Sequence, residues 1–201
     1  MSTPALRLGF IGLGIMGTPM ALHLVAAGHT LFVNTRGALP DAIAATSATS
    51  CASAAEVARQ ADVIFTMVPD TPDVELVLFG ENGVAAGLQA GGGSTADGVR
   101  KVVVDMSSIS PMATKTFAQK INALGADYID APVSGGEVGA KAASLTIMCG
   151  GDEAVFARVQ PLLALMGKNI TLVGGNGDGQ TTKVANQIIV ALNIAAVGEA
   201  L

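Results

Sequence analysis

Three glycines that follow the first apolar run constrain the fold of this chain more than any other feature. The run, residues 6–11, has the pattern of a short β-strand, and a helix is predicted to begin at residue 15. Gly12 permits a tight turn, Gly14 allows the backbone to approach a pyrophosphate, and Gly17 lets helix and strand pack closely. The phosphates would lie at the positive N-terminus of the helix. We therefore predict a dinucleotide site that includes Gly12, Leu13, Gly14, Ile15, Met16 and Gly17.

Short apolar runs alternate with helical segments along the rest of the chain. Strands are predicted at residues 6–11, 30–33, 63–68, 102–106, 128–129, 145–148 and 170–173. Helices are predicted at residues 15–27, 54–60, 71–79, 111–124 and 152–166, and from residue 180 onward. Strands joined by helical crossovers form parallel sheets. We therefore expect an α/β fold with a Rossmann-type, doubly wound, mostly parallel sheet, comprising an NAD(P)-binding domain at 1–177 and the start of an interdomain helix at 178–201.

Composition excludes several classes of protein. Of the 201 residues, 50% are hydrophobic and 13% are charged, with a formal net charge of -5. A disordered chain needs lower hydrophobicity, and a nucleic-acid binder needs a cationic face. No apolar run reaches the roughly 18 residues that cross a bilayer, and residues 1–4 show no signal-peptide pattern. Cys51 and Cys149 fit reduced, packed thiols rather than a disulfide framework or a metal cluster, so we expect a cytoplasmic protein without a metal site.

The end of the second predicted strand bears on the choice between NAD and NADP. An NAD enzyme usually has an acidic residue here that binds the ribose 2′-hydroxyl, but this chain has Asn34, Thr35 and Arg36. An arginine pairs well with a 2′-phosphate, so NADP fits at least as well as NAD. Arg36 as a solvated loop charge remains the alternative.

Two further segments carry residues suited to binding and proton transfer. Ser134, Gly135 and Gly136 follow a predicted strand, where a hydroxyl and glycine amides can donate to a carboxylate; an ordinary turn is the alternative. Lys183 lies three and four residues before Asn186 and Gln187, on one face of the last helix. A lysine whose pKa is lowered by burial can protonate a carbonyl oxygen, although most helix lysines are solvated surface charges.

Taken together, these motifs resemble the β-hydroxyacid dehydrogenase family. The resemblance rests on GFIGLGIMGTPM at residues 9–20, DAPVSGG at 130–136 with LTIM at 145–148, and GQTTKVANQ at 179–187. Further motifs at 67–70, 79–83, 105–108 and 186–193 point to the members that act on tartronate semialdehyde. What the resemblance implies is reduction of this small semialdehyde to D-glycerate with NADPH or NADH, or, as the runner-up, interconversion of 3-hydroxyisobutyrate and its semialdehyde.

The resemblance also implies roles for individual residues. Lys183 is the expected general acid, and Asn186 and Gln187 are expected to orient the reacting oxygen. The substrate carboxylate is expected at Ser134, Gly135 and Gly136, and the cofactor cleft is expected to include Met67, Val68, Pro69 and Ser108.

The chain departs from the family pattern in several ways. Ala143 replaces a usual glycine, Gln187 replaces a common asparagine, and the loop at 91–98 is longer. The resemblance implies a helical domain after residue 201 that completes a homodimer or homotetramer, so we expect this chain to be the front part of a longer protein. A nucleotide-binding module without catalytic activity is the alternative from another functional class.

Overall fold

The computed structural model describes residues 5–201; residues 1–4, for which the sequence predicts no signal peptide, lie outside the described range. The strands are β1 (Arg7–Ile11), β2 (Thr30–Asn34), β3 (Thr49–Ser50), β4 (Val63–Thr66), β5 (Val102–Asp105), β6 (Asp127–Asp130), β7 (Val133–Ser134), β8 (Leu145–Gly150) and β9 (Gly167–Gly174). The helices are α1 (Gly17–Ala26), α2 (Asp41–Ala44), α3 (Ala54–Gln60), α4 (Thr71–Phe79), α5 (Val84–Gly91), α6 (Pro111–Ala123), α7 (Gly136–Lys141), α8 (Glu153–Leu163) and α9 (Asp178–Ala200).

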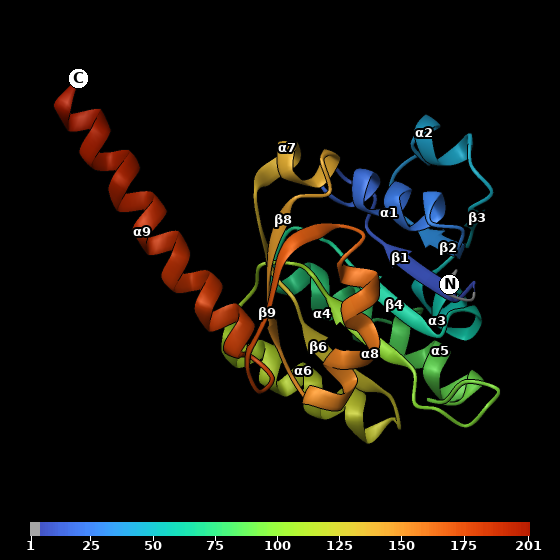
Figure 1. The fold of residues 1–201 in the computed structure, drawn as a ribbon. Helices are drawn as coiled ribbons and strands as arrows, with labels where there is room; N and C mark the ends of the chain where they lie inside the picture. Colours follow the sequence, from blue (N-terminus) through green and yellow to red (C-terminus); the bar gives the residue numbers. More distant parts are fainter. Residues whose placement is uncertain (1–4) are drawn as a thin grey trace.

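The strands form one sheet in the order β3-β2-β1-β4-β5-β6-β8-β7, with β9 paired to β8 (Figure 1). Pairs from β3 across to β6 are parallel, and β8 with β9 is parallel as well. Only the pairs that β8 makes with β6 and β7 are antiparallel among the described strands. The chain order reverses at β1, where strands are added first on one side and then on the other. This confirms the predicted doubly wound, mostly parallel sheet.

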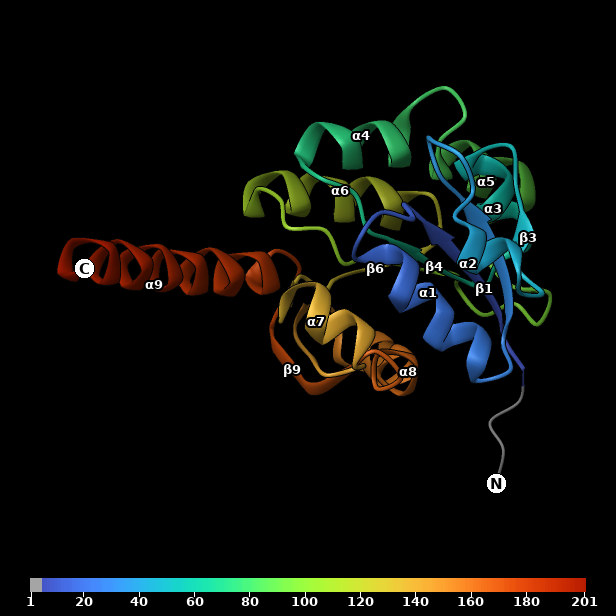
Figure 2. The ribbon, with the colours of Figure 1, turned by 90° about the horizontal axis from the view of Figure 1, so that it is seen from above.

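Helices cover both faces of the sheet (Figure 2). Helices α1, α7 and α8 lie on one face, where Phe10, Leu24 and Leu163 belong to one buried apolar cluster. Helices α3, α4, α5 and α6 lie on the other face, over a second cluster that includes Leu78 and Ile121. Burial on both faces explains why the predicted strands are continuous apolar runs rather than alternating ones.

Capping residues that are visible in the sequence set the starts of two helices. The Ser53 hydroxyl accepts a hydrogen bond from the Glu56 amide at 3.2 Å, and α3 begins at the next residue. The Asp70 carboxylate accepts from the Thr71 amide at 2.6 Å, and α4 begins there with Pro72 in its first turn. The predicted helices at 54–60 and 71–79 have the observed bounds, because side-chain caps and an early proline fix helix starts locally.

Other predicted bounds were wrong by a few residues. The predicted strand at 63–68 ends at Thr66, because the Val68 amide donates to the Ser107 hydroxyl at 3.0 Å instead of to a neighbouring strand. The helix predicted from residue 15 begins at Gly17, after the glycine turn, and the last helix begins at Asp178 rather than Gln180. The remaining differences are shifts of strand and helix ends: β9, for example, runs over Gly167–Gly174 instead of 170–173.

The sequence analysis missed five short elements: α2, β3, α5, β7 and α7. Strands β3 and β7 have two residues each and exist through pairing with β2 and β8. Helix α5 packs on α3, where a side chain on Gly87 would meet the Ala55 carbonyl oxygen at 2.2 Å. These elements depend on contacts between distant segments, which local sequence patterns do not report.

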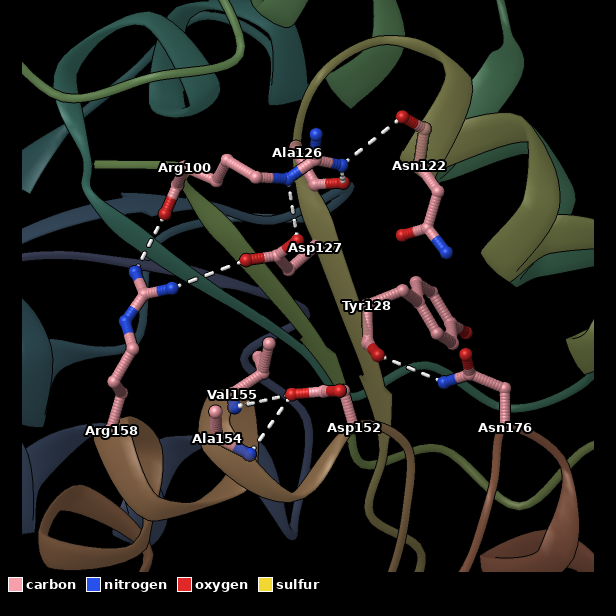
Figure 3. A network of polar contacts seen from close by, with 10 residues as sticks. All are labelled: Arg100, Asn122, Ala126, Asp127, Tyr128, Asp152, Ala154, Val155, Arg158 and Asn176. Atoms are coloured by element: carbon pink, nitrogen blue, oxygen red, sulfur yellow. Dashed lines mark hydrogen bonds and ion pairs between the residues drawn. The ribbon is translucent and has the colours of Figure 1, made fainter. Parts of the chain in front are cut away.

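Polar contacts join the strands to α8 and to the segment before α9 (Figure 3). The Asp127 carboxylate on β6 accepts from Arg100 Nε at 2.6 Å and from Arg158 Nη1, on α8, at 3.1 Å. The Asn176 side-chain amide donates to the Tyr128 carbonyl at 2.8 Å. Asp152 accepts from the amides of the first turn of α8. The Asp127 contact with Arg158 fixes α8 relative to the parallel sheet, and the Asn176 contact fixes the segment between β9 and α9.

Helix α9 extends away from the sheet over most of its length (Figures 1 and 2). Gln180 and Lys183, in its first two turns, are buried, whereas the large apolar side chains from Val184 onward are exposed. No helix in residues 5–201 combines the length and apolar character needed to span a bilayer. Cys51 and Cys149 are free and buried, and burial raises the pKa of Cys149 to about 12.

Candidate active site

The carboxyl ends of the parallel strands form a row across the sheet. The register aligns Asn34, Ile11, Thr66, Asp105 and Asp130, each the last residue of its strand. Ligands of open α/β sheets bind beyond this edge, where the chain order reverses. The glycine turn after β1 and the loops after β2, β4 and β5 all leave the sheet on this side.

A cavity of about 710 Å³ lies at this edge. The structure places around it every residue that the sequence analysis assigned to the cofactor: Gly12, Leu13, Gly14, Ile15, Met16, Gly17, Asn34, Thr35, Arg36, Met67, Val68, Pro69 and Ser108. Asp73, Leu76 and Val77 of α4 complete part of its wall and were not predicted. Segments separated by almost a hundred residues thus meet around one space of suitable size for a dinucleotide.

The three glycines meet the steric needs of such a ligand in different ways. Gly12 has φ +97°, and a side chain there would lie 2.2 Å from the Met67 carbonyl oxygen. A side chain on Gly17 would lie 1.9 Å from the Gly12 carbonyl oxygen, so this glycine permits the close contact of turn and helix. Gly14 has no neighbour within 4 Å of its absent side chain. The backbone at Gly14 therefore faces open space in the cavity wall, as a cradle for phosphates requires.

At the end of β2, the side chains of Asn34 and Arg36 already have protein partners. The Asn34 side-chain amide donates to the Cys51 carbonyl at 2.9 Å, which ties β2 to the segment after β3. Arg36 Nη1 donates to Asp73 Oδ1 at 3.1 Å. Arg36 is therefore an exposed loop residue that is paired with α4 and also borders the cofactor cavity.

A second cavity, of about 480 Å³, lies beside the start of α9. Lys183 and Gln187 line it, together with Gln180, Asp70 and the loop at 108–111. Ser108 belongs to the walls of both cavities. The loop that contains Ser108 therefore lies between the cavity lined by Lys183 and the cofactor cavity.

Lys183 is 9% exposed, and burial lowers the pKa of its ammonium group. Lys183 Nζ donates to Gln187 Oε1 at 2.9 Å, and Asn186 Nδ2 donates to the same oxygen at 3.0 Å. Lys183, Asn186 and Gln187 therefore lie together on α9, as the sequence predicted, and Gln187 contacts both of the others. A largely buried lysine with a lowered pKa releases its proton more readily than a solvated lysine does.

Asp130 and Gln180 anchor the first turn of α9, which precedes Lys183, and sequence reasoning missed both. Asp130 Oδ1 accepts from the Gly177 amide at 2.8 Å, and Asp130 Oδ2 accepts from the Gln180 amide at 3.0 Å. The Gln180 side chain accepts from the Ile109 amide at 3.0 Å and donates to the Ser107 carbonyl at 2.7 Å. This carboxylate and this amide therefore fasten the start of α9 to β6 and to the shared loop. The available signal was Gln180 itself, a polar residue one turn before Lys183.

Two buried carboxylates lie next to each other at the ends of β5 and β6. Asp105 accepts from the Thr66 hydroxyl at 2.8 Å, the Ser107 amide at 3.1 Å and the Tyr128 hydroxyl at 3.1 Å. Burial raises the pKa of Asp105, and it raises the pKa of Asp130 from 3.8 to about 6. Their hydrogen bonds to protein groups explain how the fold tolerates them.

Ser134, Gly135 and Gly136 lie at the turn from β7 into α7. Gly135 and Gly136 have φ +132° and +59°, so the turn favours glycine at both positions. None of the three lines either cavity in the described part of the chain. The structure therefore confirms a glycine turn but does not bring these residues together with Lys183, and their role in carboxylate binding stays a prediction.

Comparison with known proteins identifies the family. The NAD binding domain of 6-phosphogluconate dehydrogenase matches this chain over residues 7–175. The chain belongs to this family. The predicted dinucleotide-binding, Rossmann-type fold is therefore confirmed, and the glycine turn and the larger cavity lie within the matched residues.

Similar proteins support the resemblance to β-hydroxyacid dehydrogenases. A 2-hydroxy-3-oxopropionate reductase of Escherichia coli (strain K12) is 62% identical over 196 residues, which cover 98% of this chain and 64% of the relative. The mitochondrial 3-hydroxyisobutyrate dehydrogenase of Drosophila melanogaster is 41% identical over 98% of this chain and 58% of the relative. The structure of a Mycobacterium tuberculosis 3-hydroxyisobutyrate dehydrogenase with L-serine superposes with a TM-score of 0.81 at 33% identity, over 98% of this chain and 64% of the other. The chain spans less than two thirds of the length of these relatives.

Proposed function

We propose that this chain is the cofactor-binding part of an NAD(P)H-dependent reductase that converts tartronate semialdehyde (2-hydroxy-3-oxopropionate) to D-glycerate. The observation that carries the proposal is the position of Lys183, largely buried beside a cavity that shares Ser108 with the cofactor cavity. The 62% identity to a 2-hydroxy-3-oxopropionate reductase supports this substrate. The cofactor-binding unit is proposed to comprise residues 1–177.

The larger cavity fits the cofactor because Gly14 leaves open space at the start of α1. Residues 12–17 would hold the pyrophosphate at that helix end, and Met67, Val68, Pro69 and Ser108 would border the nucleoside parts. The reduced nicotinamide supplies the hydride. Proton supply is the task of the protein: Lys183 holds a proton beside the smaller cavity and releases it to the carbonyl oxygen of the substrate.

Neighbouring amides would orient that proton. Gln187 accepts from Lys183 and Asn186, so it holds the ammonium group in a fixed direction. Hydrogen bonds of Gln180 to Asp130 and to the Ser107 carbonyl position the first turn of α9, which leads into Lys183. The proposal assigns the substrate carboxylate to Ser134, Gly135 and Gly136 on the strength of the family resemblance.

The complete protein is proposed to be a cytoplasmic enzyme that acts on a small-molecule substrate as a homodimer or homotetramer. The free, buried thiols of Cys51 and Cys149 suit a reducing compartment. Light scattering on the purified protein measures the oligomeric state.

Steady-state assays with NADH and NADPH on a panel of small semialdehydes test the function. We expect tartronate semialdehyde to give the highest kcat/KM, and Lys183→Ala to lower kcat by about 10²- to 10⁴-fold, as loss of a general acid does. Lys168→Ala, which removes an exposed lysine from β9, is the matched control and should leave kcat unchanged. Preference for the semialdehyde of 3-hydroxyisobutyrate would favour the runner-up substrate. Cofactor binding without turnover of any substrate would favour a non-catalytic module.

A further inference from the structure

The cofactor cavity contains one ion pair, between the loop after β2 and the first turn of α4. Arg36 Nη1 and Asp73 Oδ1 are 3.1 Å apart, and both residues line the cavity. Among the described residues of its wall, these two are the only ones with a formal charge. The cavity therefore presents a neutralised pair, rather than a free cation, to a ligand.

The two partners differ in how firmly they are held. Asp73 is the third residue of α4, a helix whose start is fixed by Asp70 and Pro72, and its side chain is 28% exposed. Partial positive charge at a helix N-terminus stabilises a carboxylate in this position. Arg36 is on a loop, and its side chain is 80% exposed. Asp73 is thus the fixed charge at this wall, and the guanidinium is the group that can turn toward a ligand.

From this arrangement we infer that Asp73 contributes to cofactor specificity by lowering the affinity for a cofactor with a 2′-phosphate, NADPH, relative to NADH. The inference rests on the proposed dinucleotide site. To bind a 2′-phosphate, the Arg36 guanidinium must leave Asp73 or divide its N–H donors between Asp73 and the phosphate. The Asp73 carboxylate then lies beside the negatively charged phosphate and repels it. An unphosphorylated ribose requires neither change. Specificity is a difference between two affinities, and a repulsive group placed against one ligand contributes to it directly.

The expected effect is modest because the pair is near the surface. Exposed ion pairs contribute little, and solvent screens the repulsion between the carboxylate and the phosphate. We expect removal of the Asp73 charge to strengthen NADPH binding by about three- to tenfold, where tenfold corresponds to about 1.4 kcal/mol. NADH binding should change by less than about twofold, because the change in charge acts mainly on the phosphate.

Calorimetric titration of the 201-residue chain with NADPH and with NADH, at low ionic strength, tests the inference without any activity assay. Asp73→Asn keeps the size of the side chain and removes its charge. Glu75→Gln makes the same charge change two residues away, on an exposed position of α4 outside the cavity wall, and is the matched control. The supporting result is a lower Kd for NADPH in Asp73→Asn alone, with a smaller gain at high salt.

Two results would overturn the inference, and they are distinguishable. If the wild-type chain binds both cofactors but Asp73→Asn changes the ratio of the two Kd values no more than Glu75→Gln does, Asp73 has no part in specificity and the proposed function stands. If the wild-type chain binds neither cofactor, the proposed dinucleotide site itself is wrong, and the inference falls with it.

Discussion

Replacement of Asp130 by asparagine tests whether a buried, ionised carboxylate holds the start of α9. The wild-type side chain is fully buried and accepts from the amides of Gly177 and Gln180. Burial is the largest cause of the rise in the Asp130 pKa from 3.8 to about 6, with a further contribution from the charge of Asp105. Above about pH 6, folding therefore transfers an ionised carboxylate from water into the protein interior.

The sign and size of the effect follow from the two pKa values. Because the pKa is higher in the folded state than in the unfolded state, the folded protein binds more protons between them, and stability falls as the pH rises through 6. The full difference is about 3 kcal/mol, and about 1.4 kcal/mol of it lies between about pH 5 and pH 8. Burial raises the pKa of Asp105 too, which acts on stability in the same direction.

Urea unfolding of the wild-type chain and Asp130→Asn from about pH 5 to pH 8 measures the effect. Asparagine offers one acceptor for the two amides, so the variant should be less stable than the wild type at about pH 5, by about 1 to 3 kcal/mol. The decisive quantity is the slope: the wild-type free energy of unfolding should fall by about 1.4 kcal/mol more than that of the variant across this range. Asp97→Asn, in an exposed loop, should keep the wild-type slope. Parallel curves for wild type and Asp130→Asn would refute the reasoning.

The remaining predictions concern the cavity and one strained residue. Arg36→Ala should weaken NADPH binding about tenfold and NADH binding little, and equal losses in the two titrations would exclude a phosphate contact. Gly14→Ala should keep the thermal midpoint but weaken cofactor binding, whereas Gly17→Ala should lower the midpoint, because only the second methyl group would meet backbone, at 1.9 Å from the Gly12 carbonyl oxygen. Ala143 has φ +51°, so Ala143→Gly should raise the free energy of unfolding by about 0.5 to 1 kcal/mol, since relief of left-handed strain exceeds the extra entropy of glycine; a lower urea midpoint would contradict this.

Local sequence signals predicted the part of the molecule that local interactions determine. The strand, glycine turn and helix at 7–26 follow from steric needs within one short segment. The helices predicted at 54–60 and 71–79 agree with the structure, in which the side chains of Ser53 and Asp70 cap them locally. The glycine expected by family resemblance at position 143 matches the left-handed backbone there, which this chain accommodates with alanine.

Contacts between distant segments account for what the sequence did not reveal. Gln180 lies 71 residues from Ile109, and Asp73 lies 37 residues from Arg36, so neither contact has a local pattern. Strand β7 has only two residues, and its pairing with β8 places Val133 opposite Ile147. A hydrophobic pattern predicts which residues are buried, but it does not specify which buried polar groups meet.

Ser108 gives the two cavities a common wall, and this has a thermodynamic consequence. A ligand that shifts this serine changes the free energy of binding in the neighbouring space. By linkage, the factor by which a first ligand changes the affinity for a second equals the factor by which the second changes the affinity for the first. For a ligand that moves Ser108, the affinities measured singly at the two cavities do not multiply to give the affinity for both. The order in which ligands enter is then a matter of rates rather than of equilibrium preference.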